Sequence, residues 1–197
     1  MRKLMILLAA AAVVPACASR PPAEPLPPAA AVDPNNPLMA PGFLAMAGSS
    51  DQFEIQSSQL AHQRAQSPAV HNLANMLIAD HTRSTQMLVA AAQSAGIAPP
   101  PPALLPQHQA LLDQLNAAGS GPAFDMAWRD VQIQAHQQAL TLHQNYAASG
   151  DVPALRTTAG QIVPVVQGHL QQLQGMAMAP LPPPPAPPPV GRSGERG

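Results

Sequence analysis

The stretch SPAVHNLANMLIADHTRSTQMLVAAAQSAG, residues 67–96, decides the fold of this chain. Ser67-Pro68 supplies a helix cap and a proline for the first helical position, and Gly96 is a typical C-terminal cap. Between them, apolar and small residues recur at spacings of three and four, the period of an amphipathic α-helix. These residues are Val70, Ala74, Leu77, His81, Ser84, Leu88, Ala91 and Ala95. The sequence therefore predicts one long helix whose buried face contains a histidine.

The same pattern continues on both sides of this stretch. It predicts a long helix over about 41–66, a short crossing helix over 104–118, and long helices over about 122–148 and from Pro153 onward, the last kinked at Pro164. Aromatic residues make up only 3% of the chain, and most of its 46% hydrophobic residues are Ala, Leu, Met and Val, which favours helices. Because each long helix must bury an apolar stripe, we predict an all-α, up-down four-helix bundle with a short extra helix between its second and third helices.

The N-terminal segment is typical of an exported protein. Residues 1–19 combine Arg2 and Lys3 with an apolar run and small residues, as in a signal peptide. Val14-Pro15-Ala16-Cys17 resembles a bacterial lipobox, although Pro15 departs from its usual pattern, so we predict that Cys17, the only cysteine, is lipidated. Simple cleavage near Ala16 or Ala18 is the alternative. Lipidation of Cys17 would make the protein a periplasmic lipoprotein anchored in the outer membrane.

Proline-rich segments lie on both sides of the predicted bundle. Residues 20–41 are rich in Pro and Ala and are expected to form an extended tether. Residues 179–197 are expected to form a disordered, polyproline-like tail, which is either a spacer or a ligand for an envelope protein or cell-wall partner. This leaves residues 42–178 for the bundle, which suits one domain.

Charge and short motifs exclude several function classes. The formal net charge is -1, and the basic residues of the bundle are scattered, so no nucleic-acid partner is expected. The sequence has no nucleophilic serine motif, no glycine-rich phosphate loop and no haem-attachment cysteine pair. The candidate chemistry must therefore come from polar residues on the helix faces.

Four polar residues interrupt the apolar faces near the middle of the four long helices: Glu54, His81, His136 and His169. Glu54 lies about 13 residues before the Ser67-Pro68 break and His81 about 13 after it, so the two share one height in a hairpin. When residues are counted in the same way from the turn at Gly150, His136 and His169 differ in height by about 7 Å. We expect one polar layer across the bundle, and burying it requires a metal ion or a closed hydrogen-bond network.

Both possibilities for the layer remain open at this point. Three imidazoles and one carboxylate suit a single zinc, ferrous iron, copper or nickel ion, with zinc or iron the expected cofactor. In the network alternative, Glu54 accepts hydrogen bonds from the histidines and fixes the register of the helices. A spare candidate ligand is His143, whereas His62, His71 and His108 are expected to face water. Asp80 is expected on another face from His81.

The order of these motifs resembles a known bacterial family, the ferritin-like domain of unknown function 4142. The resemblance covers about residues 42–176 and rests on Phe43 with Glu54 and Leu60-Ala61, Asp80-His81-Thr82, Phe124-Asp125 with His136, and Pro164 with His169-Leu170. It implies a ferritin-like bundle in an exported protein, with the same four polar positions and no established activity. Asp125 and Arg129, four residues apart, are expected to form a surface ion pair.

Ferritin-like redox enzymes hold two iron ions with Glu-x-x-His pairs, which this chain lacks. The residues three before His81 and His169 are Ile78 and Val166. We therefore expect no enzymatic activity, and stress-linked redox catalysis rests on analogy alone. The first hypothesis is a structural or interaction role at the cell envelope, and the alternative is a metal-binding module for storage or sensing.

Overall fold

The computed structural model of the chain describes residues 35–101 and 103–180. These residues form five helices and no strand: α1 (Ala40–Arg64), α2 (Pro68–Ser94), α3 (Pro106–Ala117), α4 (Pro122–Ser149) and α5 (Pro153–Gly175). The predicted all-α fold, with a short helix between the second and third long helices, is confirmed. The predicted signal peptide with Cys17, most of the tether and nearly all of the tail lie outside the described residues.

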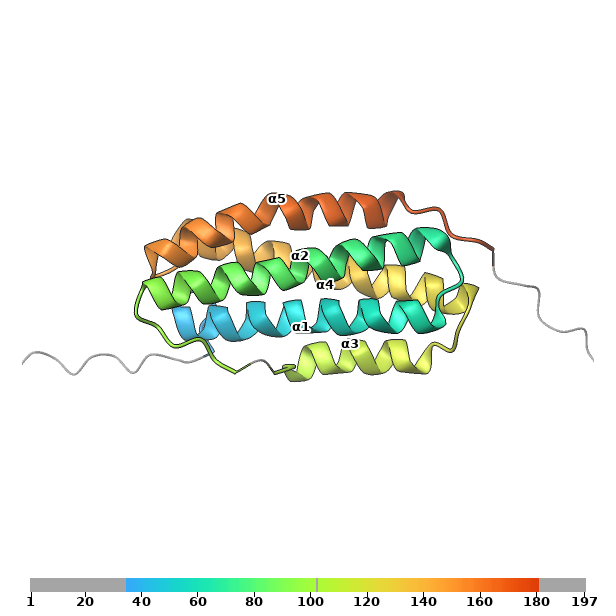
Figure 1. Cartoon of the computed structure of the whole chain (residues 1–197), viewed down its shortest axis with the longest axis horizontal. Helices are drawn as coiled ribbons and strands as arrows, with labels where there is room; N and C mark the ends of the chain where they lie inside the picture. Colours follow the sequence, from blue (N-terminus) through green and yellow to red (C-terminus); the bar gives the residue numbers. More distant parts are fainter. Residues whose placement is uncertain (1–34, 102, 181–197) are drawn as a thin grey trace, which may run out of the picture. The chain divides into compact units, whose positions relative to one another are not determined.

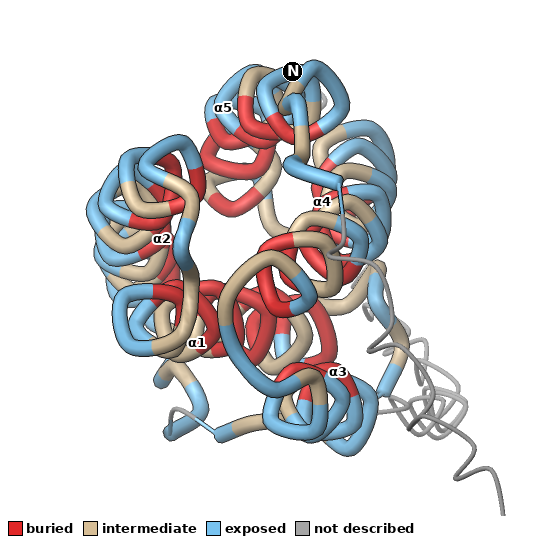
Figure 2. The backbone as a smooth tube through the Cα atoms, turned by 90° about the vertical axis from the view of Figure 1, so that its right-hand side faces the viewer, coloured by how far each residue is buried: buried red, intermediate tan, exposed pale blue. Residues whose placement is uncertain are grey.

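The four long helices enclose one interior, and α3 lies outside it. In Figure 1, α3 carries the chain back along the bundle, so that α2 and α4 run in the same direction and each is antiparallel to the helix that pairs with it. Figure 2 shows buried residues on the inward sides of α1, α2, α4 and α5, with α3 packed against α1 and α4. One such crossover connection between two helical hairpins is the ferritin-like arrangement.

The helix ends follow the turn residues in the sequence. Every helix has a proline at its first or second position, where the missing N–H costs nothing. At the end of α2, Gly96 has a φ of 72°, its N–H donates to Gln93 O at 3.0 Å, and the Ile97 N–H donates to Ala92 O at 2.9 Å. This pair of bonds is the Schellman motif, which favours glycine. α5 includes Pro164 and continues to Gly175.

The apolar core is divided into two clusters. One contains Phe53, Leu77 and Trp128, and the other contains Phe43, Leu88 and Tyr146. Along α2, α4 and α5, the change from one cluster to the other occurs at His81, His136 and His169, and along α1 it occurs between Ala47 and Phe53. A polar layer therefore crosses the middle of the bundle, as the sequence predicts.

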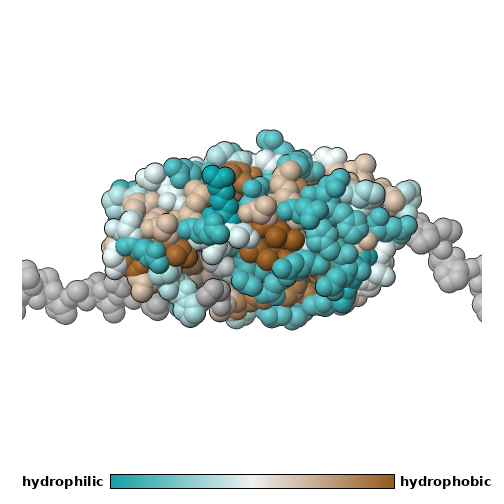
Figure 3. Space-filling view, viewed as in Figure 1, coloured by the Kyte–Doolittle hydropathy of each residue, from teal (hydrophilic) through white to brown (hydrophobic). Residues whose placement is uncertain are grey.

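The face of the molecule shown in Figure 3 is mainly hydrophilic, with small, separate hydrophobic patches. Among the described residues, only Met76 and Val165 are large apolar side chains with more than a third of their surface exposed. Within the same residues, no helix is long and apolar enough to cross a membrane.

Asp125 does not form the surface pair that the sequence predicts. Its side chain is buried, and its two carboxylate oxygens accept hydrogen bonds from the backbone N–H groups of Gln66 and Ser67, both at 3.0 Å. Arg129 instead pairs with Asp130 at 2.8 Å. The prediction was wrong because helical spacing does not show that the α1–α2 turn lies against the start of α4.

Replacing Asp125 by alanine is expected to destabilise the protein by about 2 kcal/mol, because the part-buried N–H groups of Gln66 and Ser67, just before α2, lose a charged acceptor. Urea unfolding followed by circular dichroism measures the change. Asp130→Ala is the matched control: Asp130 is also an aspartate on α4, but its side chain is 61% exposed, so its loss should change stability by less than about 0.5 kcal/mol. Equal effects of the two substitutions would contradict the capping role.

Candidate metal centre

Three of the predicted residues meet in the middle of the bundle. His81 on α2, His136 on α4 and His169 on α5 are all buried, and each offers one ring nitrogen that lies within 4.8 Å of those of the other two. Their ring centroids are 5.5, 5.5 and 5.6 Å apart. Among the described residues, this is the one group of three or more His, Cys, Asp or Glu with such spacing.

The 7 Å mismatch predicted between His136 and His169 is absorbed by the turn and by side-chain direction. Residues 150–152 form a turn that adds no helical rise. The height of His136 is therefore counted from Ser149, the end of α4, and the height of His169 from Pro153, the start of α5. Helical side chains lean toward the N-terminus of their own helix. Because α4 and α5 are antiparallel, the two side chains lean toward each other and their rings meet.

Glu54 on α1 lies beside this group. Its side chain is fully buried, and Oε1 is 3.4 Å from His136 Nδ1. Neither of its carboxylate oxygens has a hydrogen-bond partner. All four predicted residues thus lie in one layer, with the carboxylate next to the histidine of α4.

Each of the three histidines has one nitrogen held by an acceptor and one without a partner. The held atoms are His81 Nδ1, 2.8 Å from Asp51 Oδ1, His136 Nδ1, 2.9 Å from Gln132 O, and His169 Nε2, 2.9 Å from Asp80 Oδ2. The buried atoms without a partner are His81 Nε2, His136 Nε2 and His169 Nδ1. Metal-binding histidines show this arrangement, since an acceptor on one nitrogen fixes the ring and leaves the lone pair of the other for the ion.

Sequence reasoning missed two of these acceptors. Asp51 is buried, although only Glu54 was expected on that face of α1; the signal was their spacing of three residues, which places both on one side of a helix. Asp80 was expected on another face from His81 and not as a ligand, and its partly exposed carboxylate contacts His169 on α5. The pattern of one helix cannot show this contact, because it depends on how α2 and α5 pack.

Burial sets the protonation states of the layer. Desolvation raises the pKa of Glu54 to about 8 and lowers the pKa of His136 well below its usual value. Desolvation also lowers the pKa of His169, despite its bond to Asp80. Desolvation opposes protonation of His81, but its bond to Asp51 and the charges of Glu54 and Asp51 outweigh it and raise its pKa. At neutral pH, two of the rings therefore present uncharged nitrogens.

Two other histidines are buried outside this group. His108, expected to face water, is buried because its Nδ1 lies 2.6 Å from Ser49 Oγ and its ring stacks on Phe53, which holds α3 against α1. His143 points inward, and its ring packs edge-on against Phe43 at 5.6 Å. Burial lowers the pKa of His143 to about 4. Neither residue belongs to the group of three.

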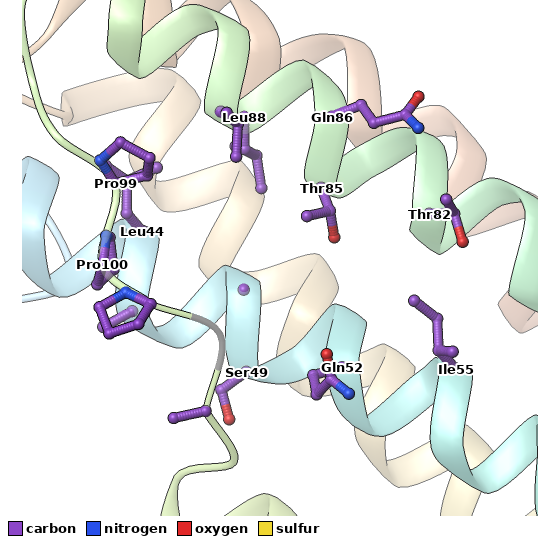
Figure 4. Close-up of a pocket in the computed structure, with 15 residues that line it drawn as sticks. Leu44, Ser49, Gln52, Ile55, Thr82, Thr85, Gln86, Leu88, Pro99 and Pro100 are labelled. Carbon is purple, nitrogen blue, oxygen red and sulfur yellow. The ribbon is translucent and has the colours of Figure 1, made fainter.

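An apolar groove of about 430 Å³ lies next to the layer, between α1, α2 and the linker that follows α2 (Figure 4). Leu44, Ile55, Leu88 and Pro100 line it. Thr85 connects the two features, because it lines the groove and its hydroxyl donates to Asp51 Oδ2 at 3.0 Å.

Solved structures share this bundle. CopM in a Cu(II)-bound form is 22% identical over 70% of this chain and 94% of that chain, with a TM-score of 0.59. CopM in a Cu(I)-bound form is 22% identical over 68% and 91%, with a TM-score of 0.56. A DUF305 fragment from Deinococcus radiodurans is 19% identical over 67% and 92%, with a TM-score of 0.54. At these identities the likeness shows a common fold.

The sequence match is more specific to one family. No curated protein matches the chain. The sequence profile of the family described as Domain of unknown function (DUF4142) matches residues 24–176, which include all five helices and the whole polar layer. The resemblance seen in the sequence is thereby confirmed, and the chain belongs to the DUF4142 family.

Proposed function

We propose that this protein binds one transition-metal ion in the middle of its bundle, through His81, His136 and His169, with Glu54 as the fourth ligand. The observation that carries the proposal is the set of three buried ring nitrogens without partners, each opposite a nitrogen fixed by an acceptor. Leaving such atoms buried and unpaired costs about 1–3 kcal/mol each, a cost that a shared ion removes.

A closed hydrogen-bond network accounts for the layer less well. Such a network would satisfy its members, whereas both oxygens of Glu54 and one nitrogen of each of the three histidines have no partner. Those atoms are three ring nitrogens and a carboxylate, which are the ligand types of a metal site once any proton on His81 Nε2 or on Glu54 has been displaced by the ion. The observation that polar groups interrupt the core thus favours metal binding over a purely structural role.

The three histidines require only a small contraction, whereas the carboxylate of Glu54 has to move toward the ion from its place beside His136 Nδ1. In a tetrahedral site with metal–nitrogen bonds of about 2.0–2.1 Å, the nitrogens lie about 3.4 Å apart. The histidine nitrogens lie within 4.8 Å of one another, so small ring rotations bring them to an ion. Four protein ligands fill a tetrahedral site and leave no open position for a substrate, which favours storage, sensing or transfer over catalysis.

The ligand types suggest which ions to test. Imidazole with carboxylate suits zinc, ferrous iron and Cu(II). Copper also belongs in the test because two of the similar structures are copper-bound forms of CopM. No thiolate or thioether belongs to the group of three, so the proposal centres on divalent ions.

The place of action is also part of the proposal, and the N-terminal sequence supports it. We propose that the N-terminal segment exports the protein and that Cys17 carries a lipid, so that the bundle binds its ion at the outer membrane, facing the periplasm. An envelope protein or cell-wall polymer at the proline-rich tail is the expected partner, and no enzymatic turnover is expected.

The direct test measures bound metal in the full chain, produced without added histidines. The protein is incubated with zinc, ferrous iron or Cu(II), exposed briefly to EDTA to remove surface ions, and analysed by mass spectrometry. We expect about one ion per chain, lost in His169→Ala and retained in His143→Gln, which changes a buried histidine outside the group. Absence of metal in every case, or equal retention in His169→Ala, would overturn the proposal.

A further inference from the structure

Two histidines meet on the surface at one end of the bundle, away from the buried layer. His62 is in the last turn of α1 and His71 in the first turn of α2. His62 lies eight residues after Glu54, about 12 Å along the helix. Their Nδ1 atoms are 3.3 Å apart, with ring centroids 5.6 Å apart and an interplanar angle of 20°.

A backbone carbonyl decides which ring nitrogen of His71 carries the hydrogen. Its Nε2 lies 3.1 Å from Ala65 O. A carbonyl oxygen only accepts, so Nε2 carries the hydrogen, and a neutral imidazole then has its lone pair on Nδ1. His71 therefore presents a metal-ligand atom toward His62 and is held at its other nitrogen, as metal-binding histidines are.

His62 completes the pair in either of its two neutral tautomers. Its ring is exposed, and with its hydrogen on Nδ1 it donates to His71 Nδ1 across the 3.3 Å gap. With that hydrogen on Nε2, toward solvent, two lone pairs face the same space. A separation of 3.3 Å matches the distance of about 3.3–3.4 Å between two nitrogens bound to one tetrahedral ion. A cation can therefore replace the shared proton after a rotation that falls mainly on the exposed ring of His62, because His71 is half-buried and held at Nε2.

We propose that His62 and His71 form a second metal site, which binds a divalent ion such as zinc or Cu(II) through their Nδ1 atoms. Water supplies the remaining ligands, so this site is open and exchanges its ion quickly. In the buried centre, by contrast, the protein supplies every ligand, so exchange of the ion is slow. The proposal stands on these two residues alone and does not depend on the buried centre.

The test separates the two sites by the rate at which zinc is lost. The zinc-saturated full chain is mixed with EDTA and a chromogenic chelator, and released zinc is followed in a stopped-flow instrument. We expect a fast phase of about one ion per chain, absent in both His62→Gln and His71→Gln and unchanged in Gln63→Ala, an exposed neighbour on α1. Affinity for the fast ion should fall more than about tenfold in each histidine variant.

Each outcome of this experiment decides between the proposals. If the wild-type chain releases no fast zinc, or the fast phase persists in His62→Gln, the surface site is wrong and the two histidines only share a proton. If the slow phase alone is missing, the buried centre is wrong and the surface site stands. His169→Ala is expected to remove the slow phase and leave the fast one, which keeps the two results distinguishable.

Discussion

Loading the buried centre with zinc, at a free concentration about 1,000 times its dissociation constant, is expected to raise the free energy of unfolding by about 4 kcal/mol. The reason is that the proposed ligands come from four different helices, α1, α2, α4 and α5, and come together only in the folded bundle. The melting temperature should rise by about 10–20 °C. Thermal unfolding of the full chain, followed by circular dichroism with zinc or with EDTA, measures the shift.

The control for this result is His136→Gln. His136 is fully buried, and a glutamine at its place fills similar space without an imidazole nitrogen. We expect this variant to lose most of the difference between zinc and EDTA, leaving only the smaller contribution of the proposed His62–His71 site. His108→Gln, which changes a buried histidine outside the layer, should keep the shift. If zinc stabilises His136→Gln as much as the wild-type chain, the ion binds elsewhere.

The pH dependence of stability should change strongly when Glu54 is replaced by glutamine. The pKa of Glu54 is raised to about 8 in the folded state from 4.5, chiefly by desolvation. A raised pKa means that the folded state holds the proton more tightly, so this stabilisation is complete below about pH 4.5 and is lost as the pH rises through 8. In the metal-free protein, the loss is on the order of 5 kcal/mol.

Glutamine imitates the protonated carboxyl and does not titrate. Unfolding by urea at several pH values, with EDTA present, should show similar stability for wild-type and Glu54→Gln near pH 4.5. The variant should become the more stable of the two as the pH approaches 8. The comparison removes the opposite trend from His136 and His169, whose pKa values are lowered and which both chains share. Parallel curves for the two chains would show that Glu54 does not titrate in this range.

Metal binding should remove the same proton. Because a metal ligand must be deprotonated, zinc binding below pH 8 releases the proton of Glu54, and affinity for zinc should rise with pH in the wild-type chain. In Glu54→Gln this part of the pH dependence should disappear, with weaker binding at every pH. Calorimetric titrations in two buffers of different ionisation enthalpy measure the released proton.

The helices were predictable because their signals are local. Pro68 and Gly96 mark the ends of α2 within about two residues, and the three-four spacing between them identifies its buried face. The role of Asp125 was not predictable, since it depends on the contact of one turn with a helix about 58 residues away in sequence. Local patterns specify elements, whereas their contacts depend on how the elements pack.

The same division holds for the metal centre. Glu54, His81, His136 and His169 stand out because polar residues on an apolar face are conspicuous in one helix at a time. Asp51 and Asp80 do not, because each is important only for the histidine it contacts on another helix. The proposal of an ion in place of a closed network also required coordinates, since it depends on which individual nitrogen atoms lack a partner.

The division of the core into two apolar clusters has a mechanical consequence. Hydrophobic contacts hold each half of the bundle together, but at the level of His136 the helices meet through polar groups that gain little from burial. An ion at the proposed centre would cross-link the four helices at this level. Because the same four helices run through both halves, ion binding is then expected to protect the backbone amides of both apolar clusters from hydrogen exchange, and not only those next to the ligands.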